Sequence, residues 1–271
     1  MKHPLIVALV VVFLIAPTAA AYVLYVSPRN SEAPLRWFKK GAVLIFDTNP
    51  PQEIAQTVAT EKTLAAFQVW SDLSCDGTLT SFPFTNGGSI NGGVVGFDDA
   101  VGAPNENLVV WVSSSNAWRH GKGVVALTSL TYDVSNGEIV DADIEFNDAE
   151  FLFSASGDPQ SNEMDLENAV AHEAGHFLGL DHSAKRLATM YAKAEPGETI
   201  KSDLLGDDME GFCALYGPDA ITIPDPTTST SPTCAVSQRG PATAPTVLWV
   251  MMFGLGIALF RRAFGATSEG R

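Results

Sequence analysis

The chain of 271 residues is long enough for one sizeable domain with further segments at its ends. Hydrophobic residues make up 46% of it and charged residues 17%, which favours a packed core and excludes a chain that is disordered throughout. The formal net charge of −15 disfavours nucleic acid as a partner, because an acidic surface repels phosphates.

The first 21 residues have the order of a secretory signal peptide. Lys2 precedes an apolar run over residues 5–16, and small residues follow up to Ala21. We expect cleavage near Ala21, and an uncleaved N-terminal anchor is the alternative. Either arrangement exports the main domain, and residues 22–35 are then a short N-terminal segment.

One block of uniform composition, residues 36–217, is expected to form the main domain. The patterns predict strands at 41–47, 107–114, 123–133 and 137–148, a further short strand around 93–97, and helices at 52–73, 165–180 and 203–217. One strand, one helix, several strands and then two helices predict an α+β domain, or a mixed sheet with helices on one side.

The predicted strand at 137–148 alternates apolar with acidic or amide side chains. Its polar positions are Asp141, Asp143, Glu145 and Asn147. Because successive side chains of a strand point to opposite faces, this pattern predicts one acidic face. Such a face is either solvated or suited to a cation.

The C-terminal part begins with a Pro-, Thr- and Ser-rich linker over residues 218–245, a composition typical of an extended stalk. We predict an apolar helix over 246–262, short for a bilayer and ending in two arginines. It is either a membrane anchor, with 263–271 as a cytoplasmic tail, or a tag that a protease removes. The order of Cys234, an apolar helix and two arginines resembles bacterial C-terminal sorting tags, which suggests a protein of bacterial type. Both readings give a protein that is held at the cell surface or released from it.

Three cysteines are present, an odd number for an exported chain. Cys75 and Cys213 lie inside the predicted domain, so we expect them to form a disulfide in an oxidising compartment. Cys234 lies in the linker, where it is a lipid-attachment or processing site, or a free thiol.

Three of the five histidines lie within eleven residues, in the stretch "AHEAGHFLGLDHS". On a helix, His172 and His176 share one face, because residues four apart are neighbours. Gly179 permits a sharp turn after the helix, which brings His182 back to the same place. Three imidazoles leave one coordination position open, as in a catalytic zinc site, and Glu173 is placed to act as the general base. The alternative is a helix that carries unrelated histidines.

The pattern H-E-x-x-H-x-x-G-x-x-H with Met190 downstream resembles the metzincin metalloproteases. Ser183 after the third histidine and Tyr191 after the methionine are similar to the matrixins, the matrix-metalloproteinase-like branch. The resemblance implies a twisted mixed β-sheet with an active-site helix, a Met-turn at Met190 and a C-terminal helix. It also implies a substrate pocket that residues 191–203 help to form.

The sequence departs from this family in two places. The space between Ala21 and Arg36 is too short for a propeptide with a cysteine switch. Glu145 stands where a strand would offer a histidine to a structural zinc, and His120 is the only other histidine nearby, so we expect no second zinc. By similarity, Asp143, Asn147 and Glu150 are candidates to hold calcium.

Together these features predict an exported, surface-anchored or released zinc endopeptidase, which we expect to be a monomer. Its partner is a protein or peptide substrate that lies extended along an edge strand of the sheet. A surface adhesion or binding protein on a vestigial metalloprotease scaffold is the alternative, since a fold does not fix a function.

Overall fold

The structure is a computed structural model that describes residues 22–100, 103, 105–220 and 246–251. The predicted signal peptide, residues 221–245 of the predicted linker, Cys234 within it, and residues 252–271 lie outside the described residues. The helices are α1 (Gln56–Gln68), α2 (Leu166–Phe177) and α3 (Gly206–Tyr216). The strands are β1 (Val23–Leu24), β2 (Val26–Ser27), β3 (Asn30–Pro34), β4 (Ala42–Asp47), β5 (Asp72–Cys75), β6 (Thr78–Ser81), β7 (Phe84–Ile90), β8 (Asn107–Trp111), β9 (Ala126–Tyr132), β10 (Ile139–Phe146), β11 (Leu152–Ser154), β12 (Glu163–Asp165), β13 (Leu180–Asp181) and β14 (Thr246–Met251).

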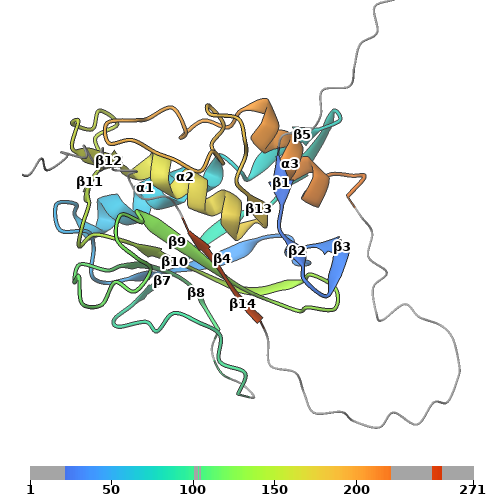
Figure 1. Ribbon diagram of the computed structural model, residues 1–271, viewed down its shortest axis with the longest axis horizontal. Coiled ribbons are helices and arrows are strands. Elements are labelled where there is room, and N and C mark those ends of the chain that lie inside the picture. The colour runs from blue at the N-terminus through green and yellow to red at the C-terminus, as the bar shows by residue number, and fades with distance from the viewer. Residues whose placement is uncertain (1–21, 101–102, 104, 221–245, 252–271) are drawn as a thin grey trace, which may run out of the picture.

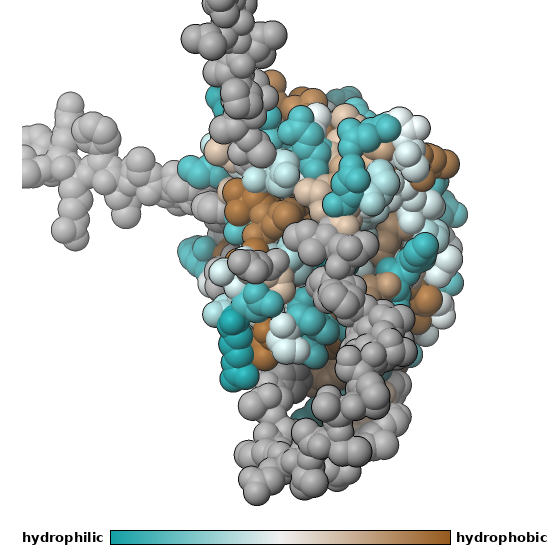
Figure 2. All heavy atoms as spheres, turned by 90° about the vertical axis from the view of Figure 1, so that its right-hand side faces the viewer, coloured by the Kyte–Doolittle hydropathy of each residue, from teal (hydrophilic) through white to brown (hydrophobic). Residues whose placement is uncertain are grey.

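The largest sheet is mixed and has the strand order β14-β9-β10-β8-β4-β7. Strand β9 is antiparallel to β10 and to β14, and the other neighbours are parallel. Helices α1 and α2 lie together on one face of this sheet (Figure 1). The predicted α+β architecture is therefore confirmed. On the side where α3 and β2–β3 lie, polar and apolar side chains are mixed on the surface (Figure 2).

The first helix and the region after it differ from the sequence prediction. Helix α1 begins at Gln56 rather than at Gln52, whose backbone N–H instead donates to the carboxylate of Asp148. The strand predicted around 93–97 is wrong, and Gly96 there has a φ of +111°. Strands β5, β6 and β7 form in the region between α1 and β8. Strand β7 contains the sequence Asn-Gly-Gly-Ser, so its pairing with β4, and not local propensity, determines it.

The prediction of an apolar helix at 246–262 is wrong for Thr246–Met251, because these residues form strand β14. This stretch is rich in β-branched and aromatic residues, which favour a strand, and the edge of β9 offers unpaired backbone groups. Residues 252–262 lie outside the described residues. Nowhere in the described part of the chain is there a helix long and apolar enough to cross a membrane.

The segment at 22–35 packs against the domain. Strand β1 pairs with β13, and the backbone N–H of Tyr25 donates to the carbonyl of Gly179 at 3.0 Å. Leu35 is fully buried in the main hydrophobic core. This segment therefore supports the chain immediately after α2.

A disulfide joins Cys75 of β5 to Cys213 of α3, the pairing that the sequence led us to expect. The two residues are 138 positions apart, so the bond closes a long loop and restricts the unfolded chain strongly. It fixes the β5–β6 hairpin to the last helix. Such a bond is typical of proteins that fold in an oxidising compartment.

The acidic face of β10 is buried, which excludes the solvated face considered from the sequence. Asp141 and Asp143 have exposed fractions of 2% and 1%. The carboxylate of Asp143 accepts hydrogen bonds from the backbone N–H groups of Gly96 and Leu108. Burial, with the second carboxyl group nearby, raises the pKa of Asp141 to about 7.

We predict that Asp141→Asn stabilises the protein at pH 8 and changes its stability little near pH 4. The folded pKa of Asp141 lies above its ordinary value of roughly 4, so the unfolded chain loses this proton first as the pH rises. The stabilising effect of the proton is complete below about pH 4 and is lost as the pH passes about 7. Thermal unfolding of both proteins at the two pH values measures the difference.

The exposed Asp72 provides the control, because Asp72→Asn makes the same chemical change at the surface. It should shift Tm little at either pH. A lower Tm for Asp141→Asn than for the wild type at pH 8 would contradict the argument.

Candidate metal centre

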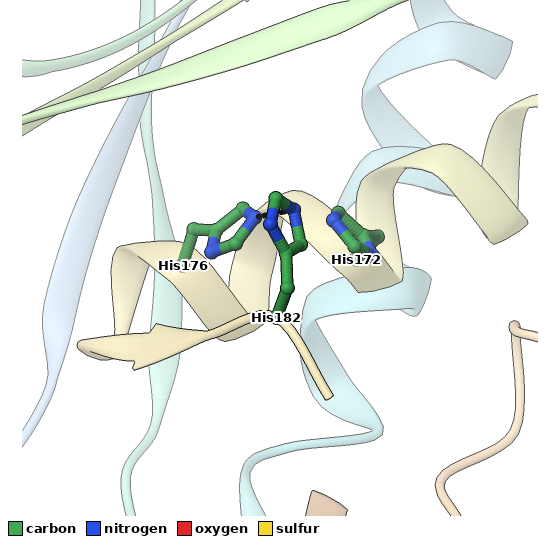
Figure 3. Close-up of side chains that lie close together, drawn as sticks. All are labelled: His172, His176 and His182. Carbon is green, nitrogen blue, oxygen red and sulfur yellow. Dashed lines mark hydrogen bonds between the residues drawn. The ribbon is translucent and has the colours of Figure 1, made fainter. Parts of the chain in front are cut away.

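Helix α2 places two histidines side by side in the interior. Its N-cap residue, Asp165, accepts a hydrogen bond from the backbone N–H of Asn168, which fixes where the helix begins. His172 and His176 lie one turn apart, and both have exposed fractions of 0%. Their rings therefore face the same side of the helix, as the sequence predicts (Figure 3).

Gly179 turns the chain back after α2. Its φ is +100°, and a Cβ atom at this position would lie 2.0 Å from the carbonyl oxygen of Leu35. Only glycine satisfies both conditions. The chain then runs through β13 and returns His182 toward the helix, with its Nε2 atom 3.1 Å from that of His176 (Figure 3).

The three imidazoles form a set that fits a zinc ion. Their candidate ligand atoms all lie within 4.8 Å of one another. The Nδ1 atoms of His172 and His176 bond to backbone carbonyls at 2.6 and 2.8 Å, which leaves each Nε2 for the metal. The Nε2 atom of His172 is buried and has no hydrogen-bond partner among the described residues. A buried nitrogen without a hydrogen-bond partner fits the role of a metal ligand.

Burial also keeps these imidazoles in the neutral form that binds metal. Desolvation lowers the pKa of all three, and it lowers that of His172 to about 3. His182 is the most accessible of the set, with a side chain that is 22% exposed. The site is therefore open to solvent on the His182 side, where a substrate has access.

Glu173 is fully buried next to the histidines. Its Oε2 atom accepts a hydrogen bond from the hydroxyl of Thr128 on β9 at 2.5 Å, while Oε1 has no partner in the described part of the chain. Burial raises the pKa of Glu173 to about 8, and the Thr128 hydroxyl partly offsets this rise. A carboxyl group with one free oxygen and a raised pKa is suited to proton transfer.

Met190 lies directly beneath the metal-site helix. A Cβ atom on Gly175 would be 2.2 Å from the Met190 sulfur, so the absence of a side chain there lets the two segments meet. Both carboxylate oxygens of Asp208 accept backbone N–H groups, from Thr189 and Met190. The first turn of α3 thus holds the Met-turn in place. The sequence predicted helix α3 but not its contact with the Met-turn. The two aspartates in the first turn of α3 are the sequence feature that could have indicated this contact.

Residues between Tyr191 and Lys201, together with Arg186 and Leu187, line a cavity of about 600 Å³ next to the Met-turn. Tyr191 and Lys201 both line it, and the Lys201 ammonium group lies 5.9 Å from the centre of the Tyr191 ring. Lys201 is almost completely buried and forms an ion pair with Glu198. A substrate pocket is expected here from the sequence, but no sequence signal indicates the buried ion pair that lines the cavity.

The calcium candidates Asp143, Asn147 and Glu150 all form hydrogen bonds within the protein, and their role in binding calcium stays a prediction. Asn147 donates to the carbonyl of Val124 and accepts from the backbone N–H of Glu150. The Glu150 carboxylate accepts from Gly123, and Asp143 faces other backbone donors. Among the described His, Cys, Asp and Glu side chains, the three histidines are the one group arranged to hold a metal.

Comparison with known proteins agrees with this geometry. Residues 117–217 match the matrixin family. This part of the chain is therefore similar to a matrixin domain. The matched residues run from the segment before β9 to the end of α3, and they include the three histidines, Glu173 and Met190.

The chain also aligns with individual proteins. Metalloendoproteinase 2-MMP of Arabidopsis thaliana is 27% identical over 185 residues, which cover 67% of this chain and 43% of that protein. Metalloendoproteinase 1-MMP of the same plant is 48% identical over 56 residues, 21% of this chain and 15% of the relative. Mouse stromelysin-1 is 33% identical over 119 residues, 40% of this chain and 24% of the relative. The chain thus spans less than half the length of each of these relatives.

We predict that the full chain binds one zinc ion and that His182→Ala weakens the binding by roughly 100-fold or more. Loss of a partner that merely orients a ligand costs 10- to 100-fold, so loss of a direct ligand should reach at least the upper end of that range. Competition with a chromophoric chelator measures the affinity. His120→Ala is the matched control, because His120 pairs with Glu145 on another part of the domain. Equal zinc affinity for His182→Ala and the wild type would refute the assignment.

Proposed function

We propose that the matrixin domain is a zinc-dependent endopeptidase that hydrolyses peptide bonds in protein substrates. One observation carries the proposal. A buried glutamate, Glu173, presents one carboxylate oxygen with no partner among the described residues, next to three histidines whose candidate ligand nitrogens lie within 4.8 Å of one another. A nonspecific metal-storage site would have no use for such a base.

The roles of the residues follow from their positions. His172, His176 and His182 would hold the zinc ion, whose chemistry when bound is to acidify a water molecule and to polarise the carbonyl group of the scissile bond. Glu173 removes a proton from the attacking water at Oε1 and delivers it to the nitrogen of the leaving amine. Burial raises the pKa of Glu173, which strengthens its carboxylate as a base and helps it to hold the proton that it takes from the water.

Strand β9 is the natural place for the substrate backbone. It lies between β10 and β14 in the sheet. Its edge away from β10 can pair with an antiparallel strand, because β14 pairs with it there. An extended peptide would use the same backbone groups of β9, with pockets for alternate side chains. Substrate and β14 would therefore compete for this edge, and cleavage requires β14 to leave it.

The adhesion alternative gains no support from the site. A scaffold that had lost its enzymatic function would tolerate changes at the base or at a ligand, and all four residues are in place. The Met-turn beneath them is held by Asp208 as well.

We also propose that the protein is exported and acts at the cell surface or outside the cell. The disulfide supports an oxidising compartment, and the N-terminal sequence has the order of a signal peptide. We propose further that the protein is of bacterial type and that it is cleaved near Ala21. Residues 252–271 would form part of an anchor or a sorting tag.

Fractionation of cells that express the full chain tests the location. We expect the protein in the membrane fraction or the medium, with an N-terminus near residue 22 by mass spectrometry. A reduced protein that keeps Met1 and stays in the cytosol would refute export. A shortened C-terminus in the mature protein would favour the sorting tag over a plain anchor.

We predict that Glu173→Ala lowers the kcat for casein and for a fluorogenic peptide by roughly 10²- to 10⁴-fold while zinc stays bound. Casein zymography and a peptide assay measure activity, and metal analysis measures zinc. Glu167→Ala is the matched control, since Glu167 lies on the same helix but pairs with Lys62 at the surface. Full activity of Glu173→Ala would exclude this mechanism, and an inactive wild type with bound zinc would exclude the function.

A further inference from the structure

Thr128 connects the edge strand to the proposed base. It lies in β9 with an exposed fraction of 0%. Its hydroxyl group is 2.5 Å from Oε2 of Glu173 and 3.3 Å from the backbone carbonyl oxygen of the same residue. Neither the histidine motif nor its spacing indicates this residue, which the sequence analysis treated only as part of a strand.

The contact makes the two oxygens of the Glu173 carboxylate unequal. A hydroxyl group has a single proton to donate, and the shorter distance is to Oε2. Oε1 is equally buried but has no partner among the described residues. The terminal torsion of a glutamate is soft, so without a fixed partner the carboxylate would rotate among several orientations.

We propose that Thr128 is a positioning residue that holds Oε2 of Glu173 so that Oε1 faces the reacting water. The inference rests on the proposed peptidase function of the same site. Proton transfer requires Oε1 within hydrogen-bond reach of that water, and a misplacement of about 1 Å costs up to roughly 100-fold in rate. Because the side chains of Thr128 and Glu173 are both fully buried, no bulk water replaces the hydroxyl group when it is removed.

The position of Thr128 in β9 also relates the base to the substrate. In the register of the sheet, Thr128 lies opposite Val250 of β14, so its backbone belongs to the edge that a substrate strand would occupy. Its side chain points the other way, toward α2 and Glu173. One residue thereby sets the distance between the peptide backbone and the proton acceptor.

The test compares Thr128→Val and Thr128→Ser in the full chain, with zinc bound and a fluorogenic peptide as substrate. Valine keeps the shape of threonine but lacks the hydroxyl group, so kcat should fall by roughly 10- to 100-fold while KM stays within about twofold. Serine restores the donor and should recover most of the rate. Thr131→Val is the matched control, since Thr131 is buried on the same strand but alternates to the opposite face.

Zinc affinity separates positioning from a merely structural role. Thr128 also contacts the backbone of α2, so a shift of the helix would move His172 and His176 and weaken zinc binding. Positioning predicts an unchanged zinc affinity for Thr128→Val and, in its crystal structure, a Glu173 carboxylate rotated from its wild-type orientation.

A wild-type kcat for Thr128→Val, or a loss of zinc affinity that parallels the loss of rate, overturns the proposal. So does a Thr128→Ser variant as slow as the valine variant. These results leave the peptidase function intact as long as the wild type cleaves and Glu173→Ala does not. If the wild type fails to cleave, the peptidase function falls and this role for Thr128 falls with it.

Discussion

The metal site depends on one close contact between backbones, where Gly179 passes over the carbonyl group of Leu35. At this point the chain leaves α2, turns with a positive φ and enters β13, which leads to His182. Any side chain at residue 179 would push the two segments apart and carry His182 away from the helix. The contact also explains why the N-terminal strands matter, since they supply both Leu35 and the partner strand of β13.

Burial around this turn gives the site its chemical character. The same low-polarity surroundings keep the histidines neutral and raise the pKa of Glu173, because burial disfavours the charged form of either group. Neutral imidazoles can bind a metal, and a raised pKa makes the carboxylate form of Glu173 a stronger base. No separate device is required for each, since one desolvated pocket produces both.

Much of the site was predictable because its signals are local. The spacing of His172, His176 and His182 and the glycine between them lie in one short stretch, and helix periodicity converts that spacing into geometry. Contacts between distant segments were not predictable. Asp208 meets the Met-turn, Thr128 meets Glu173, and β7 exists because β4 pairs with it, although its own sequence has low strand propensity. The alternation of apolar and acidic residues in β10 correctly predicted a strand. The same pattern could not predict that the acidic face of this strand is buried.

Strand β9 makes two kinds of contact, one through its backbone edge and one through a side chain. Its outer edge presents backbone groups to an added strand, and its inner face presents Thr128 to the base on α2. Under the proposed function, the substrate backbone and the base would therefore both contact β9, because Thr128 lies in the edge strand and its side chain reaches Glu173. Rigid pairing at the edge would then favour substrates whose backbone lies flat along β9 over those that bulge away from it. In this arrangement, selection for extended peptides and correct placement of the proton acceptor have the same physical origin.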